Sequence, residues 1–498
     1  MAGLILIAGA GPVGLTMAVA LKRQGVDVRI VDKALARTSQ SKALVLWPRT
    51  LELLDIQGGS GAFVAAGTPA RGARILVDGQ TVIHFDFATA RSAYRYALMI
   101  PQSETERLLE LSLEAAGLTV ERGTTLVFFE EGADGVRTVL RHLDGREEEL
   151  RADWLVGCDG AHSTVRHGLA SATFEGDTLP SEWLLADLQI NGDLPGDEIS
   201  TYFSSEGVTV FFPIEGSRFR VVANVGLTAD ADTSDPTLEQ IQALLEQRGF
   251  HWVAHDPVWM SRFRINERKV QNYRQGRVFL AGDAAHVHSP AGGQGMNTGM
   301  QDAINLSWKL AMVWRGVATP ALLDSYSPER SAIGQQVLRN AGVMTRVGLA
   351  TNPLLRKLLS LAGRAISHIP ALLQKQVDQF TEINLGYPSS PLTSSPDGAA
   401  RHPAGGERAP DTPLTVDGFA SLYAALGTGR FIVLSVGGQL VELAPPLAAL
   451  ATALRVDAAL GYDAGHVYLI RPDAYVALST PATDTHALIK ALEEIAGR

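Results

Sequence analysis

The chain has 498 residues, 46% of them hydrophobic and 19% charged, so it is long enough for two or three domains with large buried cores. The formal net charge is -10, with acidic and basic residues interspersed, which argues against a nucleic acid as the main partner. Cys158 is the only cysteine, which excludes an internal disulfide, and no apolar run of about 20 uncharged residues predicts a membrane-spanning helix. We therefore expect a cytoplasmic protein without a membrane, nucleic-acid or metal partner.

The first 32 residues carry the strongest pattern. An unbroken apolar run, Leu4–Ala8, predicts a buried parallel strand, and an apolar helical pattern covers about residues 12–24. Between them lie three glycines at GxGxxG spacing, Gly9, Gly11 and Gly14. The first permits a tight turn, the second lets a pyrophosphate approach the backbone, and the third lets helix and strand pack closely. The next strand ends at Asp32, which can accept hydrogen bonds from a ribose. This motif predicts a dinucleotide site and leaves open whether the dinucleotide is FAD or NAD.

Two further kinds of sheet pattern follow. Residues 74–87 suggest two strands around the turn Asp78-Gly79, in a sheet other than the first. A helix within residues 100–117 precedes strand-like runs at residues 119–122, 125–130, 137–142 and 148–151. Residues 174–264 alternate like antiparallel strands, interrupted by one helix. This block predicts a second domain inserted into the first.

The remaining chain is helical and then mixed. Residues 276–316 predict a strand, a glycine-rich turn and a long apolar helix, and helical patterns continue from Leu322 to about Phe380. The Pro-, Gly- and Ser-rich residues 388–413 predict a linker. The last stretch of about 100 residues alternates strands with helices, one of them over Leu447–Leu454, and predicts a separate small domain.

Two more glycine-containing motifs accompany the first. One is the run CDGAHSTVR, residues 158–166, and the other is GDAAH, residues 282–286, followed by Pro290 and GGQGMN. In the second, a strand delivers Asp283 to a turn where its carboxylate can bind a sugar-alcohol hydroxyl. The glycines after Pro290 leave backbone N–H groups facing outwards, and such a nest stabilises negative charge like that of a reduced flavin ring.

In this combination the sequence resembles the single-component FAD-dependent aromatic hydroxylases, also called class A flavoprotein monooxygenases. The runs LLDSYSPER, RAPD and RPDAYVAL resemble the branch that includes phenol hydroxylase and polyketide hydroxylases. The resemblance implies an α/β fold with a Rossmann-like FAD-binding domain, an inserted antiparallel-sheet substrate domain and a C-terminal thioredoxin-like α/β domain. The implied boundaries are residues 1–173 (with 74–100 contributing to the substrate domain), 174–270, 271–387, a linker at 388–413, and 414–498.

The resemblance also implies a set of cofactor contacts, with FAD bound and NADPH or NADH as co-substrate. The ADP half of FAD would contact Gly9, Gly11, Gly14 and Asp32, and Pro12 and Lys33 are further implied cofactor contacts. The remaining implied contacts are Arg37, Lys42, Gln102, Asp159, Arg166, Gly282, Asp283, Pro290, Gly293, Gly295, Met296 and Asn297. Lys42 stands where the family usually has an arginine, and it cannot form the same two-pronged phosphate contact.

Substrate-pocket candidates are residues that can line an aromatic site beside the flavin. They are Trp47, Tyr202, Phe212, Arg218, His288 and Pro290. Core packing is an alternative for the aromatic residues, solvation for Arg218, and a local backbone hydrogen bond for His288. Some phenol hydroxylases carry an acid in the loop that Leu44–Trp47 fills here, so no acid or base is assigned.

The reaction implied by the resemblance is hydroxylation of a phenolic or polycyclic aromatic compound. In the family, NAD(P)H reduces FAD, and the reduced flavin takes up O2 as a C4a-hydroperoxide whose distal oxygen the ring attacks. Alternatives are a Baeyer–Villiger or epoxidising monooxygenase, a flavin-binding protein without oxygenase activity, and a plain NAD-dependent dehydrogenase. The sequence leaves open the identity of the substrate, the choice of nicotinamide, and whether the protein is a monomer or a homodimer.

Overall fold

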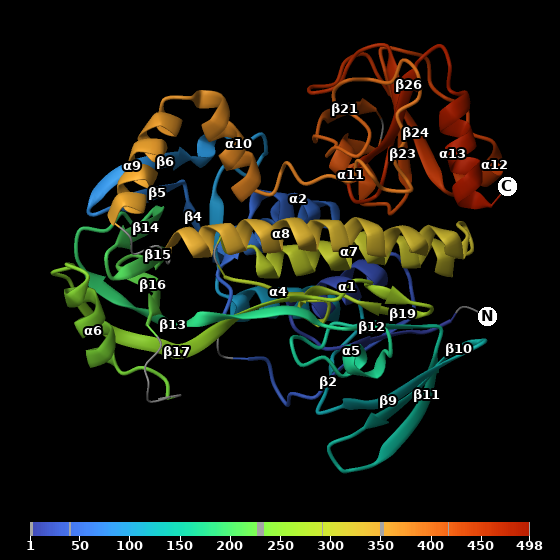
Figure 1. Cartoon of the computed structure of the whole chain (residues 1–498). Coiled ribbons are helices and arrows are strands. Elements are labelled where there is room, and N and C mark those ends of the chain that lie inside the picture. The colour runs from blue at the N-terminus through green and yellow to red at the C-terminus, as the bar shows by residue number, and fades with distance from the viewer. Residues whose placement is uncertain are drawn as a thin grey trace.

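The computed structural model describes residues 3–38, 41–226, 234–290, 292–348, 353–416 and 418–497. Helices α7 (Gly295–Trp314) and α8 (Tyr326–Gly348) run across the middle of the molecule (Figure 1). The long antiparallel strands lie towards one end of these helices, and the C-terminal region lies beside the other end. The predicted α/β fold is confirmed.

The first sheet is the one predicted from the N-terminal motif. Its order is β18-β19-β12-β1-β2-β8, and every pairing in it is parallel except that between β18 and β19. The strands are β1 (Ile5–Ala8), β2 (Val28–Asp32), β8 (Glu121–Arg122), β12 (Trp154–Gly157), β18 (Arg274–Gln275) and β19 (Val278–Leu280). Since β1, β12 and β19 are parallel neighbours, the turns that follow them meet at one edge of the sheet.

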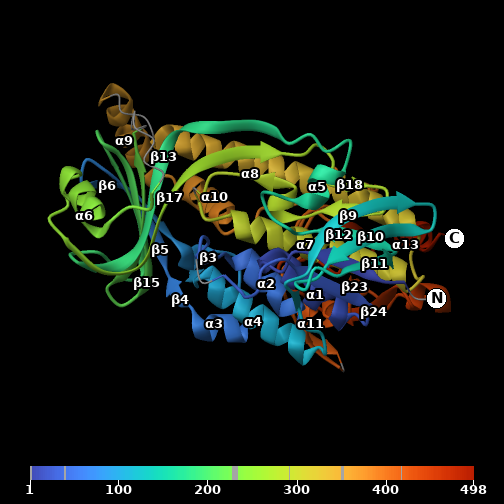
Figure 2. The same ribbon diagram turned by 90° about the horizontal axis from the view of Figure 1, so that it is seen from below.

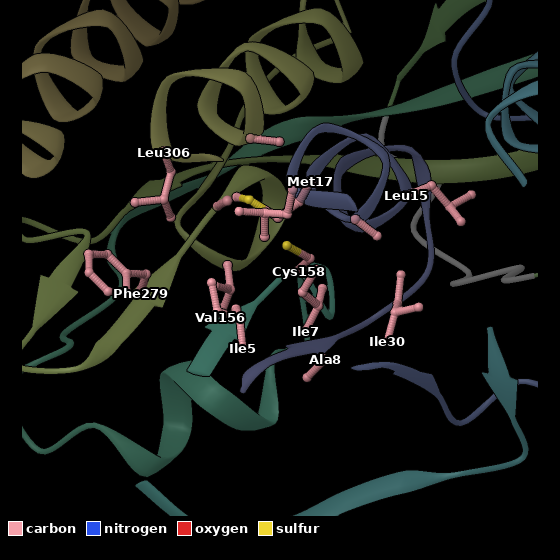
Figure 3. Close-up of a cluster of buried hydrophobic side chains, with 14 of the residues drawn as sticks. Ile5, Ile7, Ala8, Leu15, Met17, Ile30, Val156, Cys158, Phe279 and Leu306 are labelled. Atoms are coloured by element: carbon pink, nitrogen blue, oxygen red, sulfur yellow. The ribbon is translucent and has the colours of Figure 1, made fainter. Parts of the chain in front are cut away.

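The core of this unit lies between the sheet and its helices. Helix α1 (Pro12–Arg23) packs against α7, and Figure 3 shows Ile5 and Ile7 of β1 close to Met17 and Cys158. Ile5, Leu6 and Ile7 are fully buried, because a parallel strand here is covered on both faces. This packing fixes the edge of the sheet at which the three glycine turns emerge.

Smaller elements surround that unit. A three-stranded antiparallel sheet contains β9 (Thr125–Gly132), β10 (Gly135–Arg141) and β11 (Glu147–Ala152), and a second has the order β3-β7-β4. The other elements of this part are β3 (Val45–Leu46), α2 (Pro48–Ile56), α3 (Gly61–Ala66), β4 (Thr68–Ala70), β7 (Ala97–Met99), α4 (Gln102–Ala115) and α5 (Thr164–Gly168). Short 3-10 helices are η1 (Phe87–Thr89), η2 (Gly282–Ala284) and η3 (Pro320–Ser325).

An eight-stranded sheet forms the far end of the molecule, as Figure 2 shows from below. Its order is β20-β17-β13-β16-β15-β14-β5-β6. The strands are β5 (Gly72–Val77), β6 (Gln80–Asp86), β13 (Glu175–Asn191), β14 (Glu198–Ser204), β15 (Gly207–Glu215), β16 (Arg218–Val225), β17 (Val253–Lys269) and β20 (His286–Val287). Its pairings are antiparallel apart from β5 with β14, which attaches the predicted hairpin around Asp78-Gly79 to this sheet. Helix α6 (Leu238–Gln247) covers one face, and β20 links the sheet to the glycine turns.

The C-terminal region contains a four-stranded sheet of order β24-β23-β25-β26. Its elements are β21 (Pro413–Val416), β22 (Phe419–Ser421), α11 (Leu422–Leu426), β23 (Phe431–Val436), α12 (Pro445–Ala448), β24 (Ala451–Val456), β25 (His466–Ile470), β26 (Val476–Pro481) and α13 (His486–Ala496). The helix predicted over Leu447–Leu454 is only partly right, because α12 ends at Ala448 and the second half of that run belongs to β24, which pairs in parallel with β23. Its alanines favour a helix locally, and pairing in the sheet overrides that preference. The thioredoxin-like assignment and the domain boundaries stay predictions.

A buried ionic cluster ties this region to the central helices. Both Glu329 oxygens on α8 accept from the Arg471 guanidinium, at 2.7 and 2.9 Å, and Lys309 of α7 donates to Glu329 at 2.7 Å. All three side chains have no exposed surface. Charges buried this deeply need close partners, so the C-terminal region is fixed to α7 and α8 rather than loosely tethered.

Candidate cofactor and substrate site

A cavity of about 740 Å³ lies where the three glycine turns meet the eight-stranded sheet. On the side of the turns it is lined by Gly11, Pro12, Lys42, Gln102, Gly160, Ala161, His162, Asp283, His288, Pro290, Gly293, Gly295 and Met296. On the side of the sheet it is lined by Ile75, Phe85, Phe87, Trp183, Leu185, Ile199, Phe203, Val210, Phe212, Val222 and Phe263, with Trp47 and Phe380 beside them. The cavity thus has one polar half and one apolar half.

The first turn has three glycines with different reasons to be glycine. Gly9 has φ +101°, and a Cβ there or at Gly14 would collide with the backbone, with Cys158 O and Gly9 O respectively. Gly11 has φ -76°, and a Cβ there would meet no protein atom within 4 Å. Neither strain nor packing within the chain explains glycine at this position, whereas a phosphate against the backbone does.

Asp32 closes the turn from the end of β2. Its Oδ2 accepts from Ala10 N at 2.6 Å and its Oδ1 from Ala34 N at 2.7 Å. The carboxylate therefore holds the glycine turn and keeps lone pairs that a ribose hydroxyl can use. Lys33 and Arg37 do not line the cavity; Lys33 is exposed, and Arg37 pairs with Glu110 at 2.8 Å.

The second turn is held by the two charged residues predicted to contact cofactor. Asp159 accepts from Ser163 Oγ at 2.5 Å and from Val165 N at 3.2 Å. Arg166 is buried and donates to the carbonyls of Ala161 at 2.6 Å and Ala284 at 3.0 Å, and burial lowers its pKa. Neither side chain lines the cavity. Arg166 instead joins the second turn to the third, and the stretch from Gly160 to His162 forms the cavity wall.

The third turn presents Asp283 to the cavity. Gly282, at φ +60°, donates its N–H to Asp302 Oδ2 at 2.9 Å, which fixes the turn from behind. Burial raises the pKa of Asp283, and the nearby His286 and Lys42 oppose that shift. The α7 N-terminus follows, with Gly295 and Met296 in the wall, so free N–H groups and the positive end of a helix dipole face the cavity.

Asn297 is placed differently from its predicted neighbours. Its side chain is fully buried and donates to Val45 O at 2.8 Å and Gly293 O at 3.0 Å, and it accepts from Trp47 N at 2.9 Å. Those bonds occupy the amide, so the side chain supports the wall and does not reach into the cavity.

Lys42 and Gln102 lie in the cavity wall together. Gln102 accepts from Ala43 N at 3.2 Å, and the carbonyl of Lys42 accepts from Arg220 at 2.9 Å. These bonds fix the loop before β3, which leaves the Lys42 ammonium as a cation at the polar half of the cavity.

The substrate-pocket candidates divide into residues that line the cavity and residues that do not. Phe212, Trp47, His288 and Pro290 line the cavity. Tyr202 is paired with Thr209 and stacks edge-on with Phe250 and Phe211 on the α6 side. Arg218 lies outside the lining and pairs with Asp256 at 2.5 Å. Side chains alternate between the faces of a strand, so the register separates Tyr202 from Phe212, whereas Arg218 shares the phase of the cavity wall and lies beyond its edge.

Arg220 is a cavity residue that sequence reasoning missed. It is 2% exposed, it binds Asp187 of β13 through two 2.7 Å contacts, and it donates to the Lys42 carbonyl. Arg218 and Arg220 occupy equivalent phases of one alternating strand, so the sequence carries no signal that distinguishes them. Burial and the pairing with Asp187 provide it.

His288 has one nitrogen bonded and one left over. Its Nδ1 lies 2.8 Å from Ser289 O, which can only accept, so Nδ1 carries the proton. Nε2 is buried without a protein partner. A Cβ atom at position 295, where the chain has glycine, would lie 3.6 Å from it. Burial, and then the neighbouring His286, lower the pKa of His288 to about 4, so the imidazole is neutral near pH 7 and Nε2 is an acceptor.

These residues fit FAD. The open space beside Gly11, the N-terminal ends of α1 and α7 and the acceptor Asp283 all belong to the cavity wall, and a dinucleotide needs groups of these kinds. Within the described ranges, no cluster of three or more His, Cys, Asp or Glu side chains forms a metal site, and no helix is long and apolar enough to cross a membrane.

Comparison with known proteins agrees with this geometry. A family model described as an FAD binding domain matches residues 4–341, and one described as the C-terminal region of aromatic-ring hydroxylases matches residues 402–498. The chain is 35% identical to 6-methylpretetramide 4-monooxygenase of Streptomyces rimosus, over 99% of this chain and 93% of that protein. It is 33% identical to pentachlorophenol 4-monooxygenase of Sphingobium chlorophenolicum, over 82% and 76%. The chain is also similar to the solved structure of the OxyS anhydrotetracycline hydroxylase from Streptomyces rimosus. The alignment covers 100% of each chain, with 31% identity and a TM-score of 0.79.

Proposed function

The chain belongs to the FAD-dependent aromatic-ring hydroxylases, and from that premise we propose that it hydroxylates a phenolic or polycyclic aromatic compound that carries no carboxylate. It is an FAD-dependent monooxygenase, and NAD(P)H and O2 are the co-substrates typical of its family. The proposal concerns the class of substrate and the residues that handle it.

The division of the cavity carries this proposal. The half formed by the sheet is built from aromatic and branched aliphatic side chains, which favour a flat apolar ring. Arg74 borders it, but its guanidinium donates to Ser200 and Tyr202. Arg220, the other guanidinium in the wall, is neutralised by Asp187. The Arg220 charge is thus already paired and the Arg74 donors are turned towards two hydroxyl groups, so a substrate carboxylate would be desolvated in this half at a large cost.

The polar half would hold the cofactor. The Gly11 backbone and the α1 N-terminus would face the pyrophosphate, Asp32 would face the ribose, Asp283 the ribityl chain, and the Gly295 and Met296 backbone the flavin ring. The chemistry that FAD supplies there is acceptance of electrons from NAD(P)H and activation of O2. The apolar half keeps water from that region, and Pro290 lines the cavity on the side of the turns.

His288 is the residue that we assign to the substrate hydroxyl. Its Nε2 is a buried acceptor without a protein partner, and no acid stands in the loop Leu44–Trp47. A phenol O–H that donates to this nitrogen gains electron density on its ring, which favours attack on an electrophilic oxygen. Ser289 O positions the imidazole by fixing the proton on Nδ1.

The test is turnover by the FAD-loaded enzyme with NADPH or NADH. Neutral phenols and polycyclic aromatics are compared with hydroxybenzoates of similar size. We expect the neutral compounds to stimulate NAD(P)H oxidation and to gain one oxygen atom by mass spectrometry. Preference for the carboxylates would contradict the proposed class, and ring-expanded esters or epoxides would indicate the alternative oxygen insertions.

A further inference from the structure

Helices α9 (Pro353–Ser367) and α10 (Pro370–Phe380) form a projecting corner of the molecule beside β6 (Figures 1 and 2). Three leucines of α9 are largely exposed, Leu354 at 73%, Leu358 at 62% and Leu361 at 57%. Their spacing of four and three residues places them on one side of the helix, here called the leucine face. An apolar stripe in water on an otherwise ordinary surface indicates a contact that the isolated chain does not make.

The opposite side of α9 is the one that holds the helix to the protein. Gly363 lies against Val82 and Ile83 of β6, and Arg356 pairs with Asp78 at 2.5 Å. The helix is therefore anchored without its leucine face. Attachment of α9 to the rest of the protein does not explain why leucines occupy that face. The turn into α10 adds two further exposed apolar side chains, Ile369 at 45% and Leu372 at 42%.

The charge of this corner differs from that of the whole protein. The stretch from residue 353 to residue 377 contains no Asp or Glu, whereas the chain has a net charge of -10. Its four Lys and Arg residues are Arg356, Lys357, Arg364 and Lys375. Arg356 is paired with Asp78, and Arg364 donates to Gln80 at 2.5 Å, while Lys357 and Lys375 are exposed. The apolar side chains are therefore accompanied by uncompensated positive charge.

We propose that this corner docks on an anionic lipid bilayer, with the leucine face at the boundary between headgroups and acyl chains. Amphipathic helices that lie on membranes combine an apolar face with flanking lysines in this way. The anionic surface attracts Lys357 and Lys375, and it repels the acidic remainder of the protein, so attraction and repulsion favour the same orientation.

A second copy of the chain fits this surface less well. In a two-fold contact across the leucine face, Lys357 and its counterpart would approach each other without an acidic partner in this stretch. A stable interface also takes about 20 residues from each side. The exposed large apolar side chains of this corner are far fewer, namely Leu354, Leu358, Leu361, Ile369 and Leu372.

The position of α10 suggests what docking achieves. Its last residue, Phe380, lines the cavity and packs against Phe85 and Trp47. Docking through the corner would bring that wall close to the bilayer, where apolar aromatic compounds concentrate. This last point rests on the proposed function, whereas lipid binding itself does not.

The experiment is co-sedimentation of the FAD-loaded enzyme with vesicles of phosphatidylcholine alone or mixed with phosphatidylglycerol. We expect at least about tenfold stronger binding to the anionic vesicles, weakened by salt. Leu358→Asp/Leu361→Asp should reduce binding at least about tenfold, since a leucine inserted in the boundary loses its apolar contact. Lys357→Glu/Lys375→Glu tests the charge without changing the leucines.

Leu143→Asp/Leu460→Asp is the matched control, because Leu143 and Leu460 are exposed at 75% and 83% outside this corner. It should bind the vesicles like the wild type, and its circular dichroism and flavin content should also match those of the wild type. The proposal is overturned if the wild type ignores anionic vesicles, if the control loses binding equally, or if sedimentation without lipid reveals a dimer that Leu358→Asp/Leu361→Asp abolishes. Because binding is measured without turnover, its failure is separate from that of the proposed reaction.

Discussion

Trp47 and Asn297 are joined across 250 positions of the chain, with Trp47 N donating to Asn297 Oδ1 at 2.9 Å. The Trp47 indole also donates to Gly292 O at 3.0 Å, and Asn297 donates to Gly293 O at 3.0 Å. These bonds lock the loop before α7 against β3. The apolar wall at Trp47 and the α7 N-terminus are therefore held at a fixed distance and orientation. A flavin ring bound between the substrate and the α7 N-terminus would need such a fixed site.

Asn297→Asp should damage this connection more than its size suggests. The new carboxylate would face the carbonyls of Val45 and Gly293, which both accept from the native amide. We expect a loss of about 3 kcal/mol in unfolding free energy, because a buried charge replaces two satisfied donors. Denaturant unfolding measures the loss. Asn272→Asp, at an exposed asparagine, is the control, and an equal effect of both changes would contradict this role.

Gly11 and Gly14 should respond in opposite ways to the same methyl group. Gly14→Ala places a Cβ against Gly9 O, so we expect a loss of about 3 kcal/mol in stability. Gly11→Ala meets no protein atom within 4 Å, so the protein should fold normally yet bind FAD at least about tenfold more weakly. Thermal unfolding of the apoprotein and flavin titration separate the two effects. Normal FAD affinity in Gly11→Ala would show that the phosphate lies elsewhere.

Asp283→Ala should weaken flavin retention without unfolding the protein. Asp283 faces the cavity, and a hydrogen bond from a ribityl hydroxyl to a carboxylate is worth about 1.5 to 3 kcal/mol, or about tenfold to a hundredfold in affinity. Equilibrium titration with FAD, followed by flavin fluorescence, measures it. Asp177→Ala, at an exposed position of β13, should retain wild-type affinity, and wild-type retention in Asp283→Ala would mean that the turn is misassigned.

Features of this protein that depend on a short stretch of sequence were predicted better than features that depend on contacts between distant residues. The turn of Gly9–Gly14 and the end of β2 at Asp32 can be predicted from the spacing of residues within one short stretch of the sequence. The face of Tyr202 does not, because it depends on the register Ser200↔Phe211 between β14 and β15. That register places Tyr202 on the face covered by α6. A shift of the register by one residue would turn the other side chains of the strand towards the cavity.

The same limit applies to charged residues. The resemblance implied that Asp159 and Arg166 contact cofactor, and within the chain Asp159 bonds the Ser163 hydroxyl and Val165 N while Arg166 bonds carbonyls of the second and third turns. Arg220 became visible only when folding placed Asp187 beside it. A sequence identifies a charge, whereas its function depends on what the fold places within hydrogen-bond distance.

His288 offers a prediction in which the sign of a pH effect is fixed. Its pKa is lowered to about 4 in the folded protein from 6.5, so between these values the unfolded chain binds a proton that the folded protein does not. Stability contributed by the neutral imidazole is therefore present above pH 6.5 and lost as the pH falls towards 4. We expect the wild type to lose about 2 kcal/mol more than His288→Gln between about pH 7 and about pH 5.

Turnover of the same variant tests the assigned contact with substrate. If the phenol donates to Nε2, His288→Gln should lower kcat about a hundredfold near pH 7 with little change in KM, because the acceptor matters most as the ring reacts. The deficit should shrink as the pH approaches the phenol's own pKa, since the substrate then ionises unaided. A deficit that is constant with pH would indicate that His288 only supports the wall, and His162→Gln, at the cavity rim, should show neither effect.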